Sequence, residues 1–159
     1  MSQISQTRID KILEWAVTIS FMLMILTVVI QVVGRYALPW SPHWTEEMAR
    51  FCFIYMVSLG AGLAVKERAY INVSIFLDGL NSKWKIWMDS MILFSIMVLM
   101  LFMLVFSLPL VKIVSLQDSA SMRISMGFIY FSMTCMSFFV AYYSLLELLK
   151  NFGKILRSR

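Results

Sequence analysis

The stretch SMILFSIMVLMLFMLVFSLPLV, residues 90–111, contains no charged residue over 22 positions. A helix needs roughly 20 apolar residues to cross ~30 Å of hydrocarbon, so this stretch can span a membrane by itself. Two more uncharged stretches, Trp15–Gly34 and Ile124–Leu146, meet the same requirement. A fourth, Phe51–Val65, has only 15 uncharged residues, which is about 22 Å of helix. We therefore expect an all-α integral membrane protein with four transmembrane helices.

The short second stretch can span only if its helix also takes in the residues directly before it. Those residues include Glu46, Glu47 and Arg50. Lipid penalises charged side chains unless they are paired or face protein or water. The sequence therefore predicts a group of paired charges at one membrane edge.

Composition agrees with a membrane protein and excludes an ordinary soluble domain. Hydrophobic residues make up 60% of the 159 positions, and the mean hydropathy is +0.80. The net charge of +5 comes from residues in the loops and tails, where it indicates topology and not nucleic-acid binding. We expect a single membrane domain over residues 1–159, with spans at approximately 13–35, 45–66, 84–112 and 123–149.

The distribution of Lys and Arg predicts the orientation. Both tails and the central loop lie on one side and contain ten of these residues, namely Arg8, Lys11, Lys66, Arg68, Lys83, Lys85, Lys150, Lys154, Arg157 and Arg159. The other side has four, namely Arg35, Arg50, Lys112 and Arg123. The positive-inside rule therefore places both termini in the cytoplasm.

Two segments are expected to lie along the membrane surface. Residues Met1–Glu14 have apolar side chains at near-helical spacing, and Tyr70–Leu80 is apolar but interrupted and too short to cross. Aromatic residues near the ends of the spans suit the headgroup level and contact with membrane lipids. These expected interfacial anchors are Trp15, Tyr36, Trp40, Trp84 and Trp87.

The charges at the start of the second helix form the first candidate site. Glu46 and Glu47 lie four and three residues before Arg50, so all three can share one helical face. Arg35 approaches from the neighbouring helix, with Gln31 one turn earlier. This cluster either tethers the first hairpin, contacts a partner subunit or periplasmic component, or forms a substrate or ion site. Its expected members are Gln31, Arg35, Trp44, Glu46, Glu47 and Arg50.

A run of small residues in the second span forms the second candidate site. The pairs Ser58/Gly62 and Gly60/Ala64 have the four-residue spacing that allows helix backbones to approach closely. The contact could be internal or with another protein, and the residues leave both interpretations open.

The sequence gives no sign of catalysis or of a bound cofactor. His43 is the only histidine, which excludes a haem site with two axial histidines. No residues have the spacing of metal ligands, and there is no glycine-rich phosphate loop. Cys52 and Cys135 fall inside spans and are interpreted as packing residues. The middle third of every span lacks a charged residue or histidine, so this chain is not expected to be the translocating element.

Three segments resemble a known family. QVVGRY at 31–36, WTEEMAR at 44–50 and LGAGLAVK at 59–66 are similar to the small membrane subunit of tripartite ATP-independent periplasmic (TRAP) transporters. The similarity is strongest over residues 27–78, and the later spans match in hydropathy.

The resemblance implies a location and partners. In such transporters a large multi-span subunit of the bacterial inner membrane carries substrate and sodium, and a soluble periplasmic protein delivers the substrate. The small subunit belongs to the fixed scaffold, so no cofactor is expected here and sodium coupling is expected in the partner. The implied substrates are organic acids, either C4-dicarboxylates or a sugar acid such as sialic acid.

Two other membrane functions compete with this interpretation. Small multidrug exporters also have four spans, but they use a carboxylate inside the first span, whereas Glu14 here precedes Trp15 at the interface. The chain could also anchor some other complex without taking part in transport.

Overall fold

Four long helices make up nearly all of the described chain. The computed structural model describes residues 8–37, 43–69 and 82–157. Its helices are α1 (Arg8–Ala37), α2 (Trp44–Lys66), α4 (Ser82–Val114) and α5 (Met126–Arg157). All four are long and apolar enough to cross a membrane, which confirms the all-α, four-span prediction. The expected surface segment 70–80 lies outside the described residues, as do residues 1–7 of the other expected surface segment. The rest of that segment, Arg8–Glu14, forms the first turns of α1.

Helix α2 begins well before its apolar stretch. It starts at Trp44 and includes both acidic residues in its first turn. Its 23 residues give a length of about 34 Å, enough to span. The prediction that the short stretch would draw in its charged leader is therefore confirmed. The acidic residues at this position also interact favourably with the positive end of the helix dipole.

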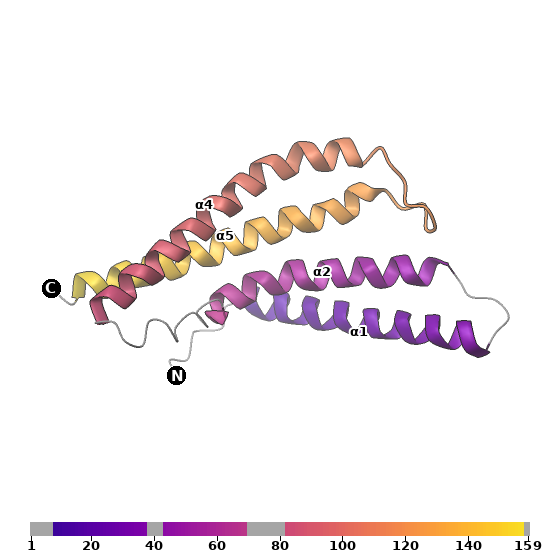
Figure 1. Cartoon of the computed structure of the whole chain (residues 1–159), viewed down its shortest axis with the longest axis horizontal. Coiled ribbons are helices and arrows are strands. Elements are labelled where there is room, and N and C mark those ends of the chain that lie inside the picture. The colour runs from indigo at the N-terminus through magenta and orange to yellow at the C-terminus, as the bar shows by residue number, and fades with distance from the viewer. Residues whose placement is uncertain (1–7, 38–42, 70–81, 158–159) are drawn as a thin grey trace.

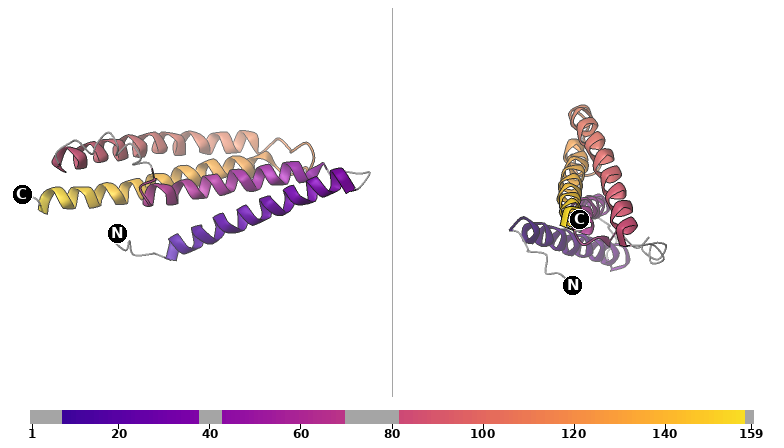
Figure 2. Two further views of the ribbon diagram at one scale, coloured as in Figure 1. Left: turned by 60° about the horizontal axis from the view of Figure 1, so that its bottom comes forward. Right: turned by 90° about the vertical axis from the view of Figure 1, so that its left-hand side faces the viewer.

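The helices pack in the order α4, α5, α2, α1, as Figure 1 shows. Neighbours α1 and α2 run antiparallel, α2 and α5 run parallel, and α5 and α4 run antiparallel. The outer helices α1 and α4 each pack extensively against a single neighbour. The left-hand view in Figure 2 shows α1 and α4 on opposite sides of α2 and α5. This leaves broad apolar surfaces on both outer helices.

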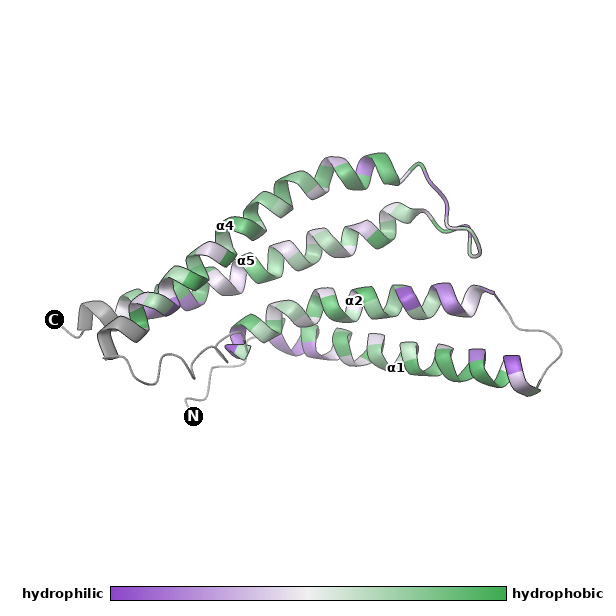
Figure 3. Cartoon of the chain, viewed as in Figure 1, coloured by the Kyte–Doolittle hydropathy of each residue, from purple (hydrophilic) through white to green (hydrophobic). Residues whose placement is uncertain are grey.

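The two ends of this layer differ in sequence and packing. We call the end near Arg8, Lys66 and Asn151 the terminal end, because both chain termini lie there (Figure 1). The opposite end, with Ala37, Trp44 and the 115–125 connection, is the loop end. Figure 3 shows hydrophilic residues concentrated at both ends and hydrophobic ones along the middle.

The hydrophobic core lies towards the terminal end. It receives a buried side chain from each outer helix, one from α2 and two from α5, namely Leu13, Leu93, Val65, Val140 and Tyr143. Most other large apolar side chains of α1 and α4 are exposed. Those surfaces suit contact with lipid or with another membrane protein.

Candidate functional site

Glu46 and Arg50 form an exposed ion pair on α2 at the loop end. The Nη2 atom of Arg50 lies 3.2 Å from Oε1 of Glu46, and the two side chains are 65% and 68% exposed. A pair one helical turn apart at such exposure adds little to stability. These two groups are therefore open to another molecule at the membrane edge.

Glu47 has a different contact. Its Oε2 atom accepts hydrogen bonds from the backbone N–H groups of Ser121 at 3.1 Å and Met122 at 2.9 Å. Both residues belong to the connection between α4 and α5. Hydrogen bonds to a charged carboxylate are among the stronger ones in proteins. Glu47 therefore ties α2 to this connection, a partner that the sequence did not indicate.

The expected convergence of Arg35 with these residues is not found. Arg35 is exposed and makes no ion pair or hydrogen bond with any residue that the structure describes. The preceding residue, Gly34, is buried. Successive helical residues point about 100° apart, so Arg35 is directed away from the face that packs. Gln31 is half-buried and Trp44 is 42% exposed.

The small residues of α2 contact both neighbouring helices. A Cβ atom at Gly62 would lie 2.9 Å from Cβ of Phe139, so this glycine permits the close approach of α2 and α5. A Cβ at Gly60 would lie 4.0 Å from Val17 of α1. Ser58 is buried, whereas Ala64 is exposed. The structure therefore uses Gly62 for an internal contact, and Ala64 faces outwards.

The predicted aromatic anchors that the structure describes lie on the surface. Trp15 and Trp87 are near the terminal end, Tyr36 is near the loop end, and each is more than half exposed. Trp40 and the side chain of Trp84 lie outside the described residues. These residues therefore lie near the two ends of the helices, where the membrane interfaces are expected.

A buried ion pair at the terminal end joins α1 to α2. The Nζ atom of Lys66 lies 2.7 Å from Oδ2 of Asp10. The hydroxyl of Tyr143, on α5, donates a hydrogen bond of 2.5 Å to Oδ1 of the same carboxylate. Asp10 is only 1% exposed. One carboxylate therefore links three helices.

Arg68, directly after α2, joins that helix to α4 and α5. Its guanidinium donates to Oε2 of Glu147 at 2.8 and 3.1 Å and to Oδ1 of Asn151 at 3.2 Å. It also lies 3.6 Å from Oδ2 of Asp89, which accepts a 2.7 Å hydrogen bond from Asn151. Lys150 pairs with the other oxygen of Glu147 at 2.6 Å.

The backbone at Arg68 is held in an unfavourable conformation. Its φ of 57° is in the left-handed region, which costs about 1 kcal/mol or more for a residue with a side chain. The several bonds of the guanidinium hold the residue there. We call Asp10, Lys66, Arg68, Asp89, Tyr143, Glu147, Lys150 and Asn151 together the terminal network.

Comparison with known sequences identifies the family. Residues 11–153 match the family described as tripartite ATP-independent periplasmic transporters, DctQ component. The chain belongs to the DctQ family. It is thus a TRAP small permease subunit, as the resemblance implied, and a component of a transporter, not an enzyme.

Individual relatives agree with this assignment. A Haemophilus influenzae protein described as a TRAP transporter small permease is 26% identical over 142 residues, which cover 87% of this chain and 86% of the relative. The sialic acid TRAP transporter small permease protein SiaQ of Vibrio cholerae is 33% identical over 45% of this chain and 42% of its own length. The isethionate TRAP transporter permease protein DctMQ of Oleidesulfovibrio alaskensis is 45% identical over 26% of this chain and 7% of its own. The multidrug-exporter interpretation is therefore set aside.

The terminal network of this DctQ-family chain was missed by sequence reasoning. The distribution of Lys and Arg along the chain indicates topology for Lys66 and Arg68 and does not predict their partners. A signal was present in the fourth span, because Glu147 falls within it and an ionisable residue inside a span needs a partner. Ser137, Ser144 and Asn151 also repeat at seven-residue spacing, and all three are buried. That spacing marks one polar face of α5.

Other side chains of the described residues give no sign of metal chemistry. No group of three or more His, Cys, Asp or Glu residues within 8–37, 43–69 and 82–157 could hold a metal ion. Cys52 is buried, Cys135 is half-buried, and neither forms a disulfide. Burial in helices agrees with the interpretation of both as packing residues.

Proposed function

We propose that this small permease subunit is a scaffold for the large membrane subunit of its TRAP transporter. The large subunit then carries an organic acid and sodium, and a periplasmic binding protein delivers the acid. Sodium coupling belongs to the partner in this proposal, and the present chain holds no cofactor. The proposal places both termini in the cytoplasm and the loop end in the periplasm of a bacterial inner membrane.

The observation that carries this proposal is the pairing of the chain's buried carboxylates. Asp10 contacts Lys66, and Asp89 and Glu147 both contact Arg68. Ion-coupled carriers place ionisable groups where cargo or ions can bind them. Here these groups lie near one end of the helices and bind each other, so they support a structural function and not passage of a solute.

The outer helices provide the surface for a partner. Both α1 and α4 expose large apolar side chains over most of their length, which suits contact with lipid or with the helices of a partner subunit. The exposed Glu46–Arg50 pair at the loop end adds a polar contact next to these surfaces. We propose that this pair, together with Arg35, contacts the large subunit or the binding protein.

The substrate class is proposed from the family alone. The printed names of two relatives refer to sialic acid and isethionate, both organic acids. We propose an organic acid as the substrate, with C4-dicarboxylates and sugar acids such as sialic acid as the first candidates.

The test is to express this subunit with a large TRAP subunit and its binding protein and to measure complex yield and uptake. We expect uptake driven by a sodium gradient in proteoliposomes containing the complex and none with the small subunit alone. Uptake against a gradient by the small subunit alone would contradict the scaffold proposal.

Charge reversal tests the loop-end contact separately. Arg50→Glu should lower both complex yield and uptake, since it places a third acidic group beside Glu46 and Glu47. Arg50→Lys is the matched control, because it keeps the positive charge beside Glu46. Unchanged yield and uptake in Arg50→Glu would refute the proposed contact and leave the scaffold proposal standing.

A further inference from the structure

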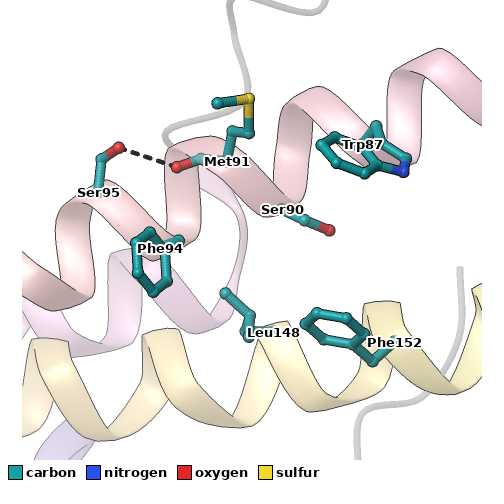
Figure 4. Close-up of a pocket in the computed structure, with 7 residues that line it drawn as sticks. All are labelled: Trp87, Ser90, Met91, Phe94, Ser95, Leu148 and Phe152. Atoms are coloured by element: carbon teal, nitrogen blue, oxygen red, sulfur yellow. Dashed lines mark hydrogen bonds between the residues drawn. The ribbon is translucent and has the colours of Figure 1, made fainter.

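An apolar groove runs between α4 and α5 near the terminal end. Its volume is about 370 Å³, and its lining includes Trp87, Ser90, Phe94, Ser95, Leu148 and Phe152. Figure 4 shows the rings of Phe94 and Phe152 and the side chain of Leu148 in the space between the two helices. Trp87, Phe94 and Phe152 are each more than half exposed, so the groove is open to its surroundings.

The two hydroxyl groups of the groove are already bonded. Ser90 donates to the carbonyl of Ile86 at 2.8 Å, and Ser95 donates to that of Met91 at 2.9 Å. Each hydroxyl therefore has its proton directed at its own helix. The groove presents a carbon surface to whatever occupies it.

The helix ends next to the groove are rich in basic residues. Asp89 is the only acidic residue of α4 and Glu147 the only one of α5. Arg68 contacts both, and Lys150 also pairs with Glu147. By their positions in the two helices, the first turn of α4 and the last turns of α5 contain four more basic residues and no further acidic one, namely Lys83, Lys85, Lys154 and Arg157.

We propose that this groove binds an acyl chain of an anionic phospholipid, with the phosphate of its headgroup among these basic residues. Basic sites between transmembrane helices favour anionic headgroups. Trp87 lies at the level where aromatic rings meet headgroups. The apolar groove and the positive charge follow one another along the same pair of helices, as the chain and headgroup do in a lipid. A helix of a partner protein is the competing occupant, and nothing in that alternative requires the excess positive charge.

Fluorescence of Trp87 provides a direct measurement. A full-length variant with Trp87 as its sole tryptophan, the other four replaced by Phe, is placed in bilayers of phosphatidylcholine and phosphatidylglycerol. Bromine on the acyl chains of one lipid or the other quenches tryptophan in contact with it. We expect phosphatidylglycerol to quench Trp87 with an apparent affinity about tenfold higher than phosphatidylcholine, as several lysines near an anionic lipid would give.

A second reporter serves as the matched control. Trp15 lies near the same end on α1 and is also exposed, but fewer basic residues lie near it in the helix, namely Arg8 and Lys11, and Glu14 offsets one of them. A variant with Trp15 as its sole tryptophan should show a much weaker preference for phosphatidylglycerol than the Trp87 variant. Equal quenching of Trp87 by both lipids would overturn the proposal.

Two changes test the two parts of the site. The triple variant Lys83→Gln, Lys85→Gln, Lys154→Gln keeps Lys150 and hence the terminal network, and should abolish the preference for phosphatidylglycerol at Trp87. Ser95→Leu partly fills the groove and should weaken quenching by both lipids. Thr18→Leu is its control, since Thr18 is an exposed helical hydroxyl bonded to the carbonyl four residues earlier, as Ser95 is. A preference that survives the triple variant would overturn the headgroup assignment.

The competing occupant is distinguished in the complex with the large subunit. If a photocrosslinker at position 95 captures the large subunit, and Trp87 loses its lipid quenching in that complex, a protein helix occupies the groove and the lipid proposal is wrong. Retained quenching by phosphatidylglycerol in the complex supports it.

Discussion

The two ends of this small subunit both carry charged residues, yet they use them in opposite ways. At the terminal end, Asp10 and Glu147 are 1% and 3% exposed. Asp10 has partners on α2 and α5, and Glu147 bonds Arg68, directly after α2, and Lys150. At the loop end, Glu46 and Arg50 are mostly exposed and pair within one turn of α2. The same residue types therefore hold the helices together at one end and remain accessible at the other.

Burial explains this difference. A buried ion that loses its partner costs several kcal/mol, about 3–5 kcal/mol in measured cases, whereas an exposed pair contributes about 0–1 kcal/mol. The terminal end also holds the hydrophobic core, beside which Asp10 and Glu147 are buried. We infer that the terminal end fixes the arrangement of the helices and that the loop end is the more adaptable part.

The largest effect is expected from Arg68→Ala. This change leaves Glu147 and Asp89 without their shared cation and should lower the free energy of unfolding by about 3 kcal/mol. Arg50→Ala at the loop end is the control and should change it by less than about 1 kcal/mol. Denaturation of both variants in mixed micelles measures the difference. Equal effects would remove the distinction between the two ends.

A smaller effect is expected from Gly62→Ala. The added Cβ would lie 2.9 Å from Cβ of Phe139, so α2 and α5 must separate, at a cost of about 1–3 kcal/mol. Gly60→Ala, two residues away, meets only Val17 at 4.0 Å and should stabilise the helix by up to about 1 kcal/mol. Thermal unfolding of the two variants should therefore shift in opposite directions. A Gly62→Ala variant that is no less stable than the unmodified protein would show that α2 does not depend on close contact with α5.

Tyr143→Phe tests the bond of α5 to α1. It removes the hydroxyl that donates to Asp10 and keeps the ring in the core. We expect a loss of about 1–2 kcal/mol in the free energy of unfolding, since Lys66 still pairs with the carboxylate. Tyr130→Phe, an exposed tyrosine on the same helix, should have no measurable effect. Similar results for both would show that Asp10 depends on Lys66 alone.

The smallest global effect is expected from Glu47→Ala, which acts on the connection at the loop end. Without this acceptor, the N–H groups of Ser121 and Met122 should exchange their hydrogen with solvent faster. Glu46→Ala is the control, because Glu46 bonds Arg50 and not the connection. Mass spectrometry of peptides covering 115–125 measures the exchange. Unchanged exchange in Glu47→Ala would mean that the connection is held by its own backbone bonds.

The candidate site was only partly predictable from the sequence. The Glu46–Arg50 pair follows from four-residue spacing on one helix, so it was predicted and is found. Arg35 and Glu47 depend on how helices are turned relative to each other. Their spacing in the chain does not reveal that rotation. In the structure Arg35 is exposed, and Glu47 bonds the connection between α4 and α5. Apart from local pairs such as Glu147 with Lys150, the terminal network joins residues 21 to 133 positions apart, so no local pattern could assemble it.

The sequence by itself determined that this chain crosses the membrane four times, because length and hydropathy are local properties and the bilayer sets the required length. It also determined that α2 must include its charged leader. Only the tertiary structure decided which helices are neighbours, which glycine permits a close contact and which charges meet. Those outcomes depend on the rotation of each helix about its axis. Packing against the other helices sets that rotation, and the order of residues within a single helix does not.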